Sequence, residues 1–450
     1  MQLPTSLLLA AVSGLFGAAA AQNDDAELTV NTTSGSYTGF VDTSPGAAPE
    51  VNQWRGIRYG QPPVEKRRFL PPLAAKDDGL HRYAREYPTV CLQQGGNYTG
   101  IFWELVPEFQ QQDPQGEDCL FLNVWAPRKP VVNEEKKKVP VIIWDSALLT
   151  TVSVEWTKSN IEAFGGDPER MVIWGQSAGA GLVTSYVYAN GEDPIITGAI
   201  ANSGSVGIGP SGDDESDIDK FSQLAEIAGC GGGLEPEEEL ACMQEIPALR
   251  LQAILQSRRE DVPTFRPVVD NATVFSNYTE RLEQGLVAKV PLITGTTSNE
   301  GAAFSAFNKS QTTAPPPPPD NTVGPFDCSL REELKDRLTY GHTTYRYLFA
   351  GNFSNITPRY WLGAMHSSDL PLIFGTHYQF RGNSTELEWQ TSYAMEAFAT
   401  DSSKDPAMSN GLAWPKYSLD GETVVLFGNG TEAADLVSPS VIDTSDCPAG

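Results

Sequence analysis

Short apolar runs alternate along the chain with stretches of helical periodicity. Strands are predicted at residues 120–125, 139–144, 171–174, 195–201, 290–294, 343–349 and 423–427, the last of which ends the series. Helices are predicted at 154–164 and 178–188 and, with one interruption, over 216–257, whereas residues 26–45 alternate like an edge hairpin. Continuous apolar strands separated by helices predict an α/β fold, in which a mostly parallel sheet has helices on both faces.

The size and composition of the chain fit one large folded unit. It has 450 residues, of which 40% are hydrophobic and 20% charged, enough to bury a sizeable core. It is long for one simple domain, but no internal repeat or clean break in composition shows where to divide it, and residues 22–450 are assigned to one α/β domain. Residues 312–320 contain five consecutive prolines and are predicted to form a stiff, exposed connector.

The N-terminus has the pattern of a secretory signal peptide. An apolar run begins at Leu7, and three alanines at 19–21 supply a small-residue cleavage site, although no Lys or Arg precedes the run. A membrane anchor is disfavoured because the run is too short to span a bilayer and is interrupted by glycine. Residues 1–21 are therefore predicted to be removed, and the mature protein to be secreted without a transmembrane anchor.

Cysteines and glycosylation sequons agree with export. The six cysteines form an even set without a C-x-x-C pair, which favours disulfides over a metal site and leaves fifteen pairings open. No cofactor is indicated either. Nine Asn-x-Ser/Thr sequons are present, at Asn31, Asn97, Asn271, Asn277, Asn308, Asn352, Asn355, Asn383 and Asn429.

The charge of the chain bears on its partners. A net charge of −26 disfavours nucleic acid and anionic membranes as binding partners. The acidic run at 213–219 lacks a full calcium-loop pattern and is interpreted as solvated surface. Nothing in the sequence indicates an oligomeric state.

A Gly-x-Ser-x-Gly turn at residues 175–179 lies between a predicted strand and a predicted helix. In that context Ser177 is predicted to be a nucleophile on a sharp turn, where Gly175 and Gly179 avoid a collision across it. The first N–H groups of the following helix, that of Ala178 above all, would face an oxyanion forming at Ser177.

A nucleophilic serine needs a base and an acid. Four histidines are available, His81, His342, His366 and His377, and His366 is preferred because it lies in a loop between a strand and a helix. The acid candidate is Glu300, just beyond the buried strand 290–294, although 57 acidic residues make chance a serious competitor. The order Ser177, Glu300, His366 is that of α/β-hydrolases.

A set of further motifs lies in order along residues 27–447. They are 54–60 with 62–63 and 68–69, then 117–124, 160–161, 164–168, 175–179, 202–205, 299–301, and His366 with 369–370. Together these motifs resemble the type-B carboxylesterases, a family that includes cholinesterases and secreted fungal lipases. The resemblance implies an α/β-hydrolase fold with Ser177 as nucleophile, His366 as base and Glu300 as acid. It also implies the disulfides Cys91–Cys119, Cys230–Cys242 and Cys328–Cys447.

The chain departs from the family directly after Trp144. Family members continue there with a His-Gly-Gly-Gly type loop whose backbone N–H groups complete the oxyanion hole. Here the sequence passes through residues 145–150 straight into the predicted helix, so that loop, the next strand and its turn are absent. The expected fold therefore lacks a strand and the oxyanion loop after Trp144. Loss of one oxyanion donor costs about 10²–10³ in rate.

Two explanations compete for this gap and for a second one between Glu300 and Cys328. The protein is either decayed or repurposed, or the gene has been read with coding sequence omitted; the retained triad, sequons and cysteine pairs favour the omission.

The sequence thus predicts a secreted serine carboxylic-ester hydrolase that acts on small-molecule or lipid esters through an acyl-enzyme. The alternative is a catalytically impaired or dead cholinesterase-like glycoprotein with a binding role. A lipase of the same family is a third reading, which depends on acyl-chain preference.

Overall fold

The computed structural model describes most of the chain between residues 28 and 447. The described residues are 28–43, 51–93, 101, 105–106, 114–128, 138–145, 150–206, 214–257, 259–305, 324–357, 359–376, 401–406, 413–429, 432–443 and 447. The predicted signal peptide at 1–21 and the proline-rich connector at 312–320 lie outside them.

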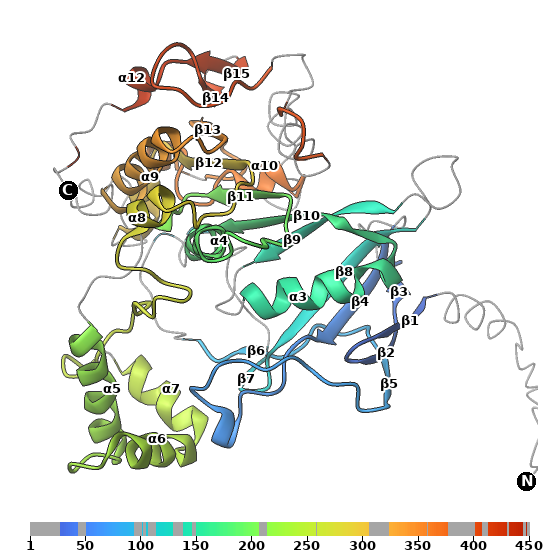
Figure 1. The fold of residues 1–450 in the computed structure, drawn as a ribbon, viewed down its shortest axis with the longest axis vertical. Helices are drawn as coiled ribbons and strands as arrows, with labels where there is room; N and C mark the ends of the chain where they lie inside the picture. Colours follow the sequence, from blue (N-terminus) through green and yellow to red (C-terminus); the bar gives the residue numbers. More distant parts are fainter. Residues whose placement is uncertain are drawn as a thin grey trace, which may run out of the picture.

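A seven-stranded sheet forms the centre of the described structure, in the order β15-β14-β13-β12-β11-β10-β9 (Figure 1). All neighbouring strands are parallel except β15, which is antiparallel to β14. Because parallel strands end at the same edge, the carboxyl ends of β10, β11 and β12 lie side by side there. The strands are β9 (Val139–Asp145), β10 (Gly166–Gln176), β11 (Gly198–Asn202), β12 (Leu292–Thr297), β13 (Thr344–Phe349), β14 (Val424–Asn429) and β15 (Glu432–Val437).

Helices cover both faces of this sheet, as the apolar pattern predicts. Helices α3 (Thr150–Asn160), α4 (Ala178–Ala189) and α8 (Tyr278–Glu283) share a core cluster with Met171 and Ile173 of β10. On the other face, Val172 and Trp174 pack in a second cluster with α10 (Leu370–Ile373). Successive side chains of a strand point to opposite faces, which is why alternate residues of β10 join the two clusters. Helix α9 (Ser329–Thr339) lies beside α8 and β13.

A separate three-stranded sheet is built from the N-terminal part of the chain. Strand β8 (Phe121–Pro127) pairs antiparallel with β4 (Val51–Arg58), which pairs with β3 (Phe40–Val41). In the described part of the chain, β8 pairs only with β4 and β9 pairs only with β10, so the two sheets are not joined. The expectation that a strand is lacking after Trp144 agrees with this arrangement. The remaining ladders are β1 (Thr29–Thr32), β2 (Gly35–Thr38) and β5 (His81–Tyr83), and β6 (Val90–Cys91) with β7 (Gln115–Gly116).

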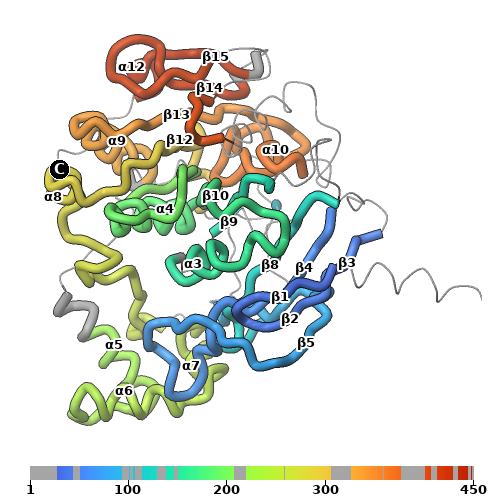
Figure 2. The backbone as a smooth tube through the Cα atoms, turned by 45° about the vertical axis from the view of Figure 1, so that its right-hand side comes forward, coloured from blue at the N-terminus to red at the C-terminus, as the bar shows by residue number. Residues whose placement is uncertain are grey.

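Three helices lie apart from the central sheet, at the bottom of both Figure 1 and Figure 2. They are α5 (Asp214–Ala228), α6 (Pro236–Glu245) and α7 (Ala248–Gln256). Arg68 ties them to the N-terminal strands, because its guanidinium donates to Glu117 at 2.6 Å and to the carbonyl oxygen of Ile246 at 2.5 Å. Two residues of the family motifs, Arg68 and Glu117, therefore serve the architecture.

The structure joins the six cysteines in the three pairs that the resemblance implies. They are Cys91–Cys119, Cys230–Cys242 and Cys328–Cys447, and no cysteine is left free. The second pair connects the turn after α5 to α6, and the third attaches the C-terminal region to the residue preceding α9. Closing loops in this way restricts the unfolded chain more than the folded one.

Some predicted boundaries are wrong. The apolar pattern makes 423–427 the last strand, yet β15 follows it, hidden because its sequence Glu-Ala-Ala-Asp-Leu-Val carries two acids. Helix α3 begins at Thr150 rather than 154, and residues 161–164 form a 3₁₀ turn. The strand predicted at 195–201 begins at Gly198. The pattern predicts neither β4 nor α9.

Candidate active site

The Gly-x-Ser-x-Gly segment forms a sharp turn between β10 and α4. Ser177 has φ 58° and ψ −120°, a left-handed conformation that a non-glycine residue adopts at a cost of about 1–3 kcal/mol. Its N–H donates to the carbonyl oxygen of Asn202 at 2.8 Å, which fixes the turn to the end of β11. A Cβ at Gly175 would lie 2.4 Å from the carbonyl oxygen of Gly179, and one at Gly204 would lie 2.3 Å from that of Ser177. Because these glycines have no side chain, the backbone segments of β10, of α4 and of the residues after β11 can approach one another closely around Ser177.

Glu300 and His366 are buried and hydrogen-bonded to each other. His366 Nδ1 contacts Glu300 Oε2, and Glu300 Oε1 accepts the N–H of Thr297 at 2.7 Å. An ionised carboxylate only accepts hydrogen bonds, so the proton of a neutral imidazole lies on Nδ1 and leaves Nε2 as the acceptor. That is the tautomer a general base requires.

Asn299 holds the two loops that carry this pair. Its N–H donates to the carbonyl oxygen of Ala364 at 2.9 Å, and its side-chain amide donates to that of Leu362 at 2.7 Å. A parallel bridge with Met365 completes the attachment. Asn299 therefore fixes the position of the Glu300 loop relative to the His366 loop, which explains its place in the Asn-Glu-Gly motif.

The side chain of Gln176 contacts the second ring nitrogen of His366, Nε2. Its amide Nε2 lies 3.0 Å from His366 Nε2 and donates to Ser367 Oγ at 2.7 Å. The nitrogen that a serine nucleophile must use is therefore already in contact with the residue preceding Ser177. The Gln176 amide must move away from His366 Nε2 before that nitrogen can accept the proton of Ser177.

A buried polar network lies behind the pair. Asp369 Oδ2 accepts from the Tyr347 hydroxyl at 3.1 Å and from the Asn202 amide at 3.3 Å, and Asn202 in turn accepts from Trp174 Nε1 at 2.5 Å. Burial, and after it the nearby Glu300 carboxylate, raise the pKa of the Asp369 carboxyl to about 6. This network joins the ends of β10, β11 and β13 under the site.

Two aromatic rings lie beside the His366 imidazole. The rings of Phe304 and Phe326 lie 5.0 and 4.9 Å from the His366 ring. Ser177 is half-buried, but Ala178, whose N–H is the expected oxyanion donor, is exposed. Strand β9 ends beside the turn, since Asp145 pairs with Gly175, and residues 146–149 lie outside the described part. Strand β9 therefore brings the chain to the Ser177 turn at the point where the family's glycine loop is expected.

The other three histidines lie elsewhere or outside the described residues. His81 contacts the hydroxyls of Ser36 and Thr38 at 3.1 Å each. His342 precedes β13, where burial and the nearby Arg337 lower its pKa to about 4. His377 is not among the described residues. Of the histidines described, His366 is the one that meets a carboxylate at the Ser177 turn.

Several other predicted features fall on described residues. The side chains of Asn31, Asn271, Asn277 and Asn352 are exposed and that of Asn355 is half-buried; Asn97, Asn308 and Asn383 are not described, and nothing is described of the Asn429 side chain. In the described part of the chain, the one group of three potential metal ligands is Asp327 with Cys328 and Cys447, whose sulfur atoms are in a disulfide. Among the same residues no helix is long and apolar enough to cross a membrane.

Sequence reasoning does not find Gln176 and Asp369 as parts of the site. Gln176 occupies the variable position of the Gly-x-Ser-x-Gly motif, which carries no signal of its own. Asp369 belongs to a segment that matches the family, three residues after His366, but its sequence position assigns it no role in the site. Both residues are recognised as parts of the site only in the structure, where distant segments of the chain lie next to each other.

Comparison with known proteins gives a consistent result. Residues 26–145 and 150–318 match the model of the carboxylesterase family. The chain is 34% identical over 487 aligned positions to a chlorogenic acid esterase of Aspergillus niger, covering 92% of this chain and 93% of the relative. It is 33% identical over 510 positions to secreted lipase 5 of Gibberella zeae, with 93% of each chain covered. An acetylcholinesterase of Leptinotarsa decemlineata is 20% identical over 533 positions, covering 89% of this chain and 82% of the relative.

Proposed function

Because this chain belongs to the carboxylesterase family, whose members hydrolyse carboxylic esters, we propose that it is a secreted serine esterase acting through Ser177. Residues 22–450 form its single catalytic domain. The observation that carries the proposal is the buried contact between Glu300 and His366, with His366 Nε2 directed at the Ser177 turn through Gln176.

The reaction follows from the roles of the three side chains. His366 Nε2 takes the proton of the Ser177 hydroxyl as Oγ attacks the ester carbonyl, and Glu300 stabilises the imidazolium that forms. The tetrahedral oxyanion accepts a hydrogen bond from the N–H of Ala178. The alcohol leaves with a proton from His366, and water, activated by the same histidine, releases the acid from the acyl-enzyme.

The expected rate of this chain is low. A water-excluded site with fixed donors stabilises an oxyanion far better than an exposed one, and here Ala178 is exposed. Each missing donor costs about 10²–10³ in rate, and such losses are not additive. The Glu300–His366 pair supports acyl transfer, and the missing glycine loop of the family pattern is expected to limit it.

The names of the two fungal relatives suggest two substrate classes. One relative is a chlorogenic acid esterase, and the other is a secreted lipase. We therefore propose small-molecule or lipid esters as substrates, and export to the medium with cleavage after Ala21 and glycosylation at the nine sequons.

Ser177→Ala tests the nucleophile directly. Protein recovered from the culture medium, with Gln22 expected as its first residue, is given p-nitrophenyl acetate and butyrate and a fluorophosphonate probe. The variant is expected to lose labelling altogether and to lose hydrolysis by about 10³-fold or more relative to the parent, because removal of a triad member leaves only residual catalysis.

Ser159→Ala serves as the matched control, since Ser159 is an exposed hydroxyl on α3. It should label and hydrolyse like the parent. Equal hydrolysis by the parent and Ser177→Ala would refute the proposal and support the alternative of a cholinesterase-like glycoprotein without catalysis.

A further inference from the structure

Gln176 is the last residue of β10, and its side chain crosses to the loop that carries His366. The ladder pairs Gln176 with Asn202 of β11, so its backbone is fixed by the central sheet. From there the side-chain amide lies 3.0 Å from His366 Nε2 and 2.7 Å from Ser367 Oγ. One amide group therefore joins the strand before the nucleophile to two consecutive residues in the loop of the base.

The positions of the protons make this amide the donor in both contacts. Glu300 accepts from His366 Nδ1, which leaves Nε2 of the neutral ring with a lone pair and no proton. A primary amide has two N–H donors, and the two contacts use both of them, one for Nε2 and one for the Ser367 hydroxyl oxygen. The lone pair with which His366 would accept a proton is thus occupied by Gln176.

The Ser177 hydroxyl is not bonded to the base. Ser177 precedes α4 without a side-chain capping bond, and among the described residues its hydroxyl forms no hydrogen bond with His366. The contact between acid and base is therefore formed, whereas the base contacts Gln176 where it would contact the nucleophile. A serine hydroxyl without a base beside it is a weak nucleophile.

The second contact of the amide is with a residue under backbone strain. Ser367 is buried and has φ 68°, a left-handed conformation that is unfavourable for a non-glycine residue. Such a conformation persists only where the surroundings enforce it, and the bond from Gln176 is one of the contacts that do so. Because Ser367 Oγ binds the other amide hydrogen, Gln176 can release His366 Nε2 without losing both bonds.

We propose that Gln176 is a positioning residue that restrains the base: in the empty site it holds the His366 ring with Nε2 occupied, and its displacement activates Ser177. The inference rests on the proposed function, in which Nε2 takes the Ser177 proton. A hydrogen bond of ordinary net strength corresponds to a factor of about 2–10 in the population of the released base. A restraint of this size slows the reaction of Ser177 without abolishing it.

The charges around His366 let pH distinguish this restraint from a structural role. Charged groups come from three segments: Glu300 at the ring, Asp369 close to Glu300, and Asp327, which follows Phe326 and pairs with Arg331 and Arg346. The group in contact with Nε2 is the uncharged amide of Gln176. Gln176→Glu would place a carboxylate there, which a lone pair on Nε2 cannot bind. The ring is then expected to take a second proton and to act as a base only at higher pH.

Two substitutions of Gln176 test the restraint in the secreted full chain, with the fluorophosphonate probe reporting on Ser177. Gln176→Met keeps the length of the side chain and removes both donors, so labelling near pH 7 should be about 2–10 times faster than in the parent. Gln176→Glu should be labelled several-fold more slowly near pH 7 and should approach the parent rate at about pH 9. The matched control is Gln223→Met on α5, an exposed glutamine that should be labelled like the parent.

Labelling of Gln176→Met at or below the parent rate would overturn the restraint. Equal losses in Gln176→Met and Gln176→Glu at every pH would mean that Gln176 only supports the loop, and they too would overturn it.

A measurement on the parent chain needs no variant at position 176. In nitrogen NMR spectra of protein with isotope-labelled histidine, the His366 signals are assigned by their loss in His366→Gln. They should show a neutral ring with the proton on Nδ1 and a hydrogen-bonded Nε2. A proton on Nε2, or an Nε2 without a hydrogen bond, would overturn the proposal.

The same spectra separate the restraint from the proposed function. The Nε2 signal should move in Gln176→Met and stay in place in Gln223→Met. If it moves but Ser177 reacts with the probe in none of the chains, the restraint is supported and the esterase mechanism is contradicted. If Ser177 reacts in the parent and the signal does not move in Gln176→Met, the esterase mechanism is supported and the restraint is overturned.

Discussion

The two ends of the central sheet are built from different kinds of strand. At one end β15 has the sequence Glu-Ala-Ala-Asp-Leu-Val and pairs antiparallel with β14. At the other end β9 reads Val-Pro-Val-Ile-Ile-Trp-Asp, with its apolar side chains half exposed. Charges on an edge strand prevent pairing with other molecules, so β15 is suited to be an edge and β9 is not.

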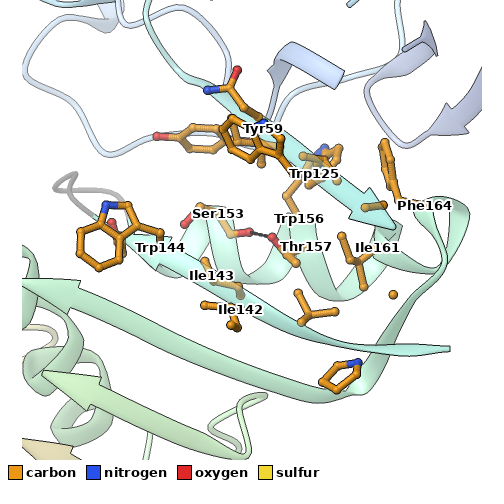
Figure 3. A pocket seen from close by; sticks show the side chains of 18 of the residues that line it. Tyr59, Trp125, Ile142, Ile143, Trp144, Ser153, Trp156, Thr157, Ile161 and Phe164 are labelled. Atoms are coloured by element: carbon orange, nitrogen blue, oxygen red, sulfur yellow. Dashed lines mark hydrogen bonds between the residues drawn. The ribbon is translucent and has the colours of Figure 1, made fainter. Parts of the chain in front are cut away.

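The two ends of the sheet also differ in how completely their strands are paired. From β10 to β14 every strand has a ladder partner on both sides, the Glu300–His366 pair is buried, and the polar groups behind it are linked in a network. Within the described part of the chain, β9 and β8 have no ladder partner toward each other, and a cavity lies between them (Figure 3). The residues proposed to perform the chemistry follow the fully paired strands.

The largest expected effect compares two tryptophans paired in register, Trp174 on β10 and Trp144 on β9. Trp174→Ala should lower the free energy of unfolding by about 3–5 kcal/mol, because a large side chain that is 1% exposed leaves a cavity. Trp144→Ala should cost about 1 kcal/mol, because much of that ring is already in water. Urea denaturation followed by circular dichroism measures both.

A loss of 3 kcal/mol or more in Trp144→Ala would contradict the comparison, since it would mean that β9 is covered in solution. Trp125→Ala on β8 provides a second exposed tryptophan and should behave like Trp144→Ala.

The second expected effect concerns Asp369, beside the fully paired strands. Its pKa is raised from 3.8 to about 6, so the folded protein holds this proton more tightly than the unfolded chain does. Folding stability therefore falls as pH rises from about 4 through 6. Asp369→Asn removes that loss, so the variant should match the parent near pH 4 and exceed it by a few kcal/mol above pH 7.

Thermal unfolding at a series of pH values measures this effect. Asp420→Asn, an exposed carboxylate on a turn, is the control and should show no such divergence between pH 4 and 8. A constant difference between Asp369→Asn and the parent at all pH values would show that the substitution acts through packing instead of charge.

The smallest expected effect on stability comes from placing charge on the apolar edge. Ile142→Lys should change the free energy of unfolding by about 0.5 kcal/mol or less, because the side chain is largely exposed, while slowing aggregation measured by light scattering. Asp435→Val makes the converse change on β15 and should speed aggregation. Equal aggregation rates of the two variants would contradict the difference between β9 and β15 as edge strands.

The sequence predicts the central part of the fold well, and the three proposed site residues are identified from position and order along the chain. Residues 171–188 read as strand, tight turn and helix because the apolar run, the glycines and the small-residue helix are all local signals. Glu300 follows a buried strand, and His366 was one of four histidines, so both could be proposed from position and order.

Other features could not be predicted because they arise between distant segments. Gln176 meets His366 across 190 positions, and Asn202 meets Asp369 across 167. Strand β15 is hidden because its acids fit an edge and break the apolar pattern. The exposure of Trp144 is equally invisible, since an apolar residue in an apolar run predicts burial.

By itself the sequence determined the family, the order of the proposed nucleophile, acid and base, and the departure from the family pattern after Trp144. Those properties are carried by short motifs and by their order along the chain. Only the tertiary structure decided that an apolar cavity lies between β8 and β9, that Gln176 contacts His366, and that Asp369 is buried beside Glu300. Burial and contact depend on which strand ends lie next to each other, and that is set by packing of the whole chain.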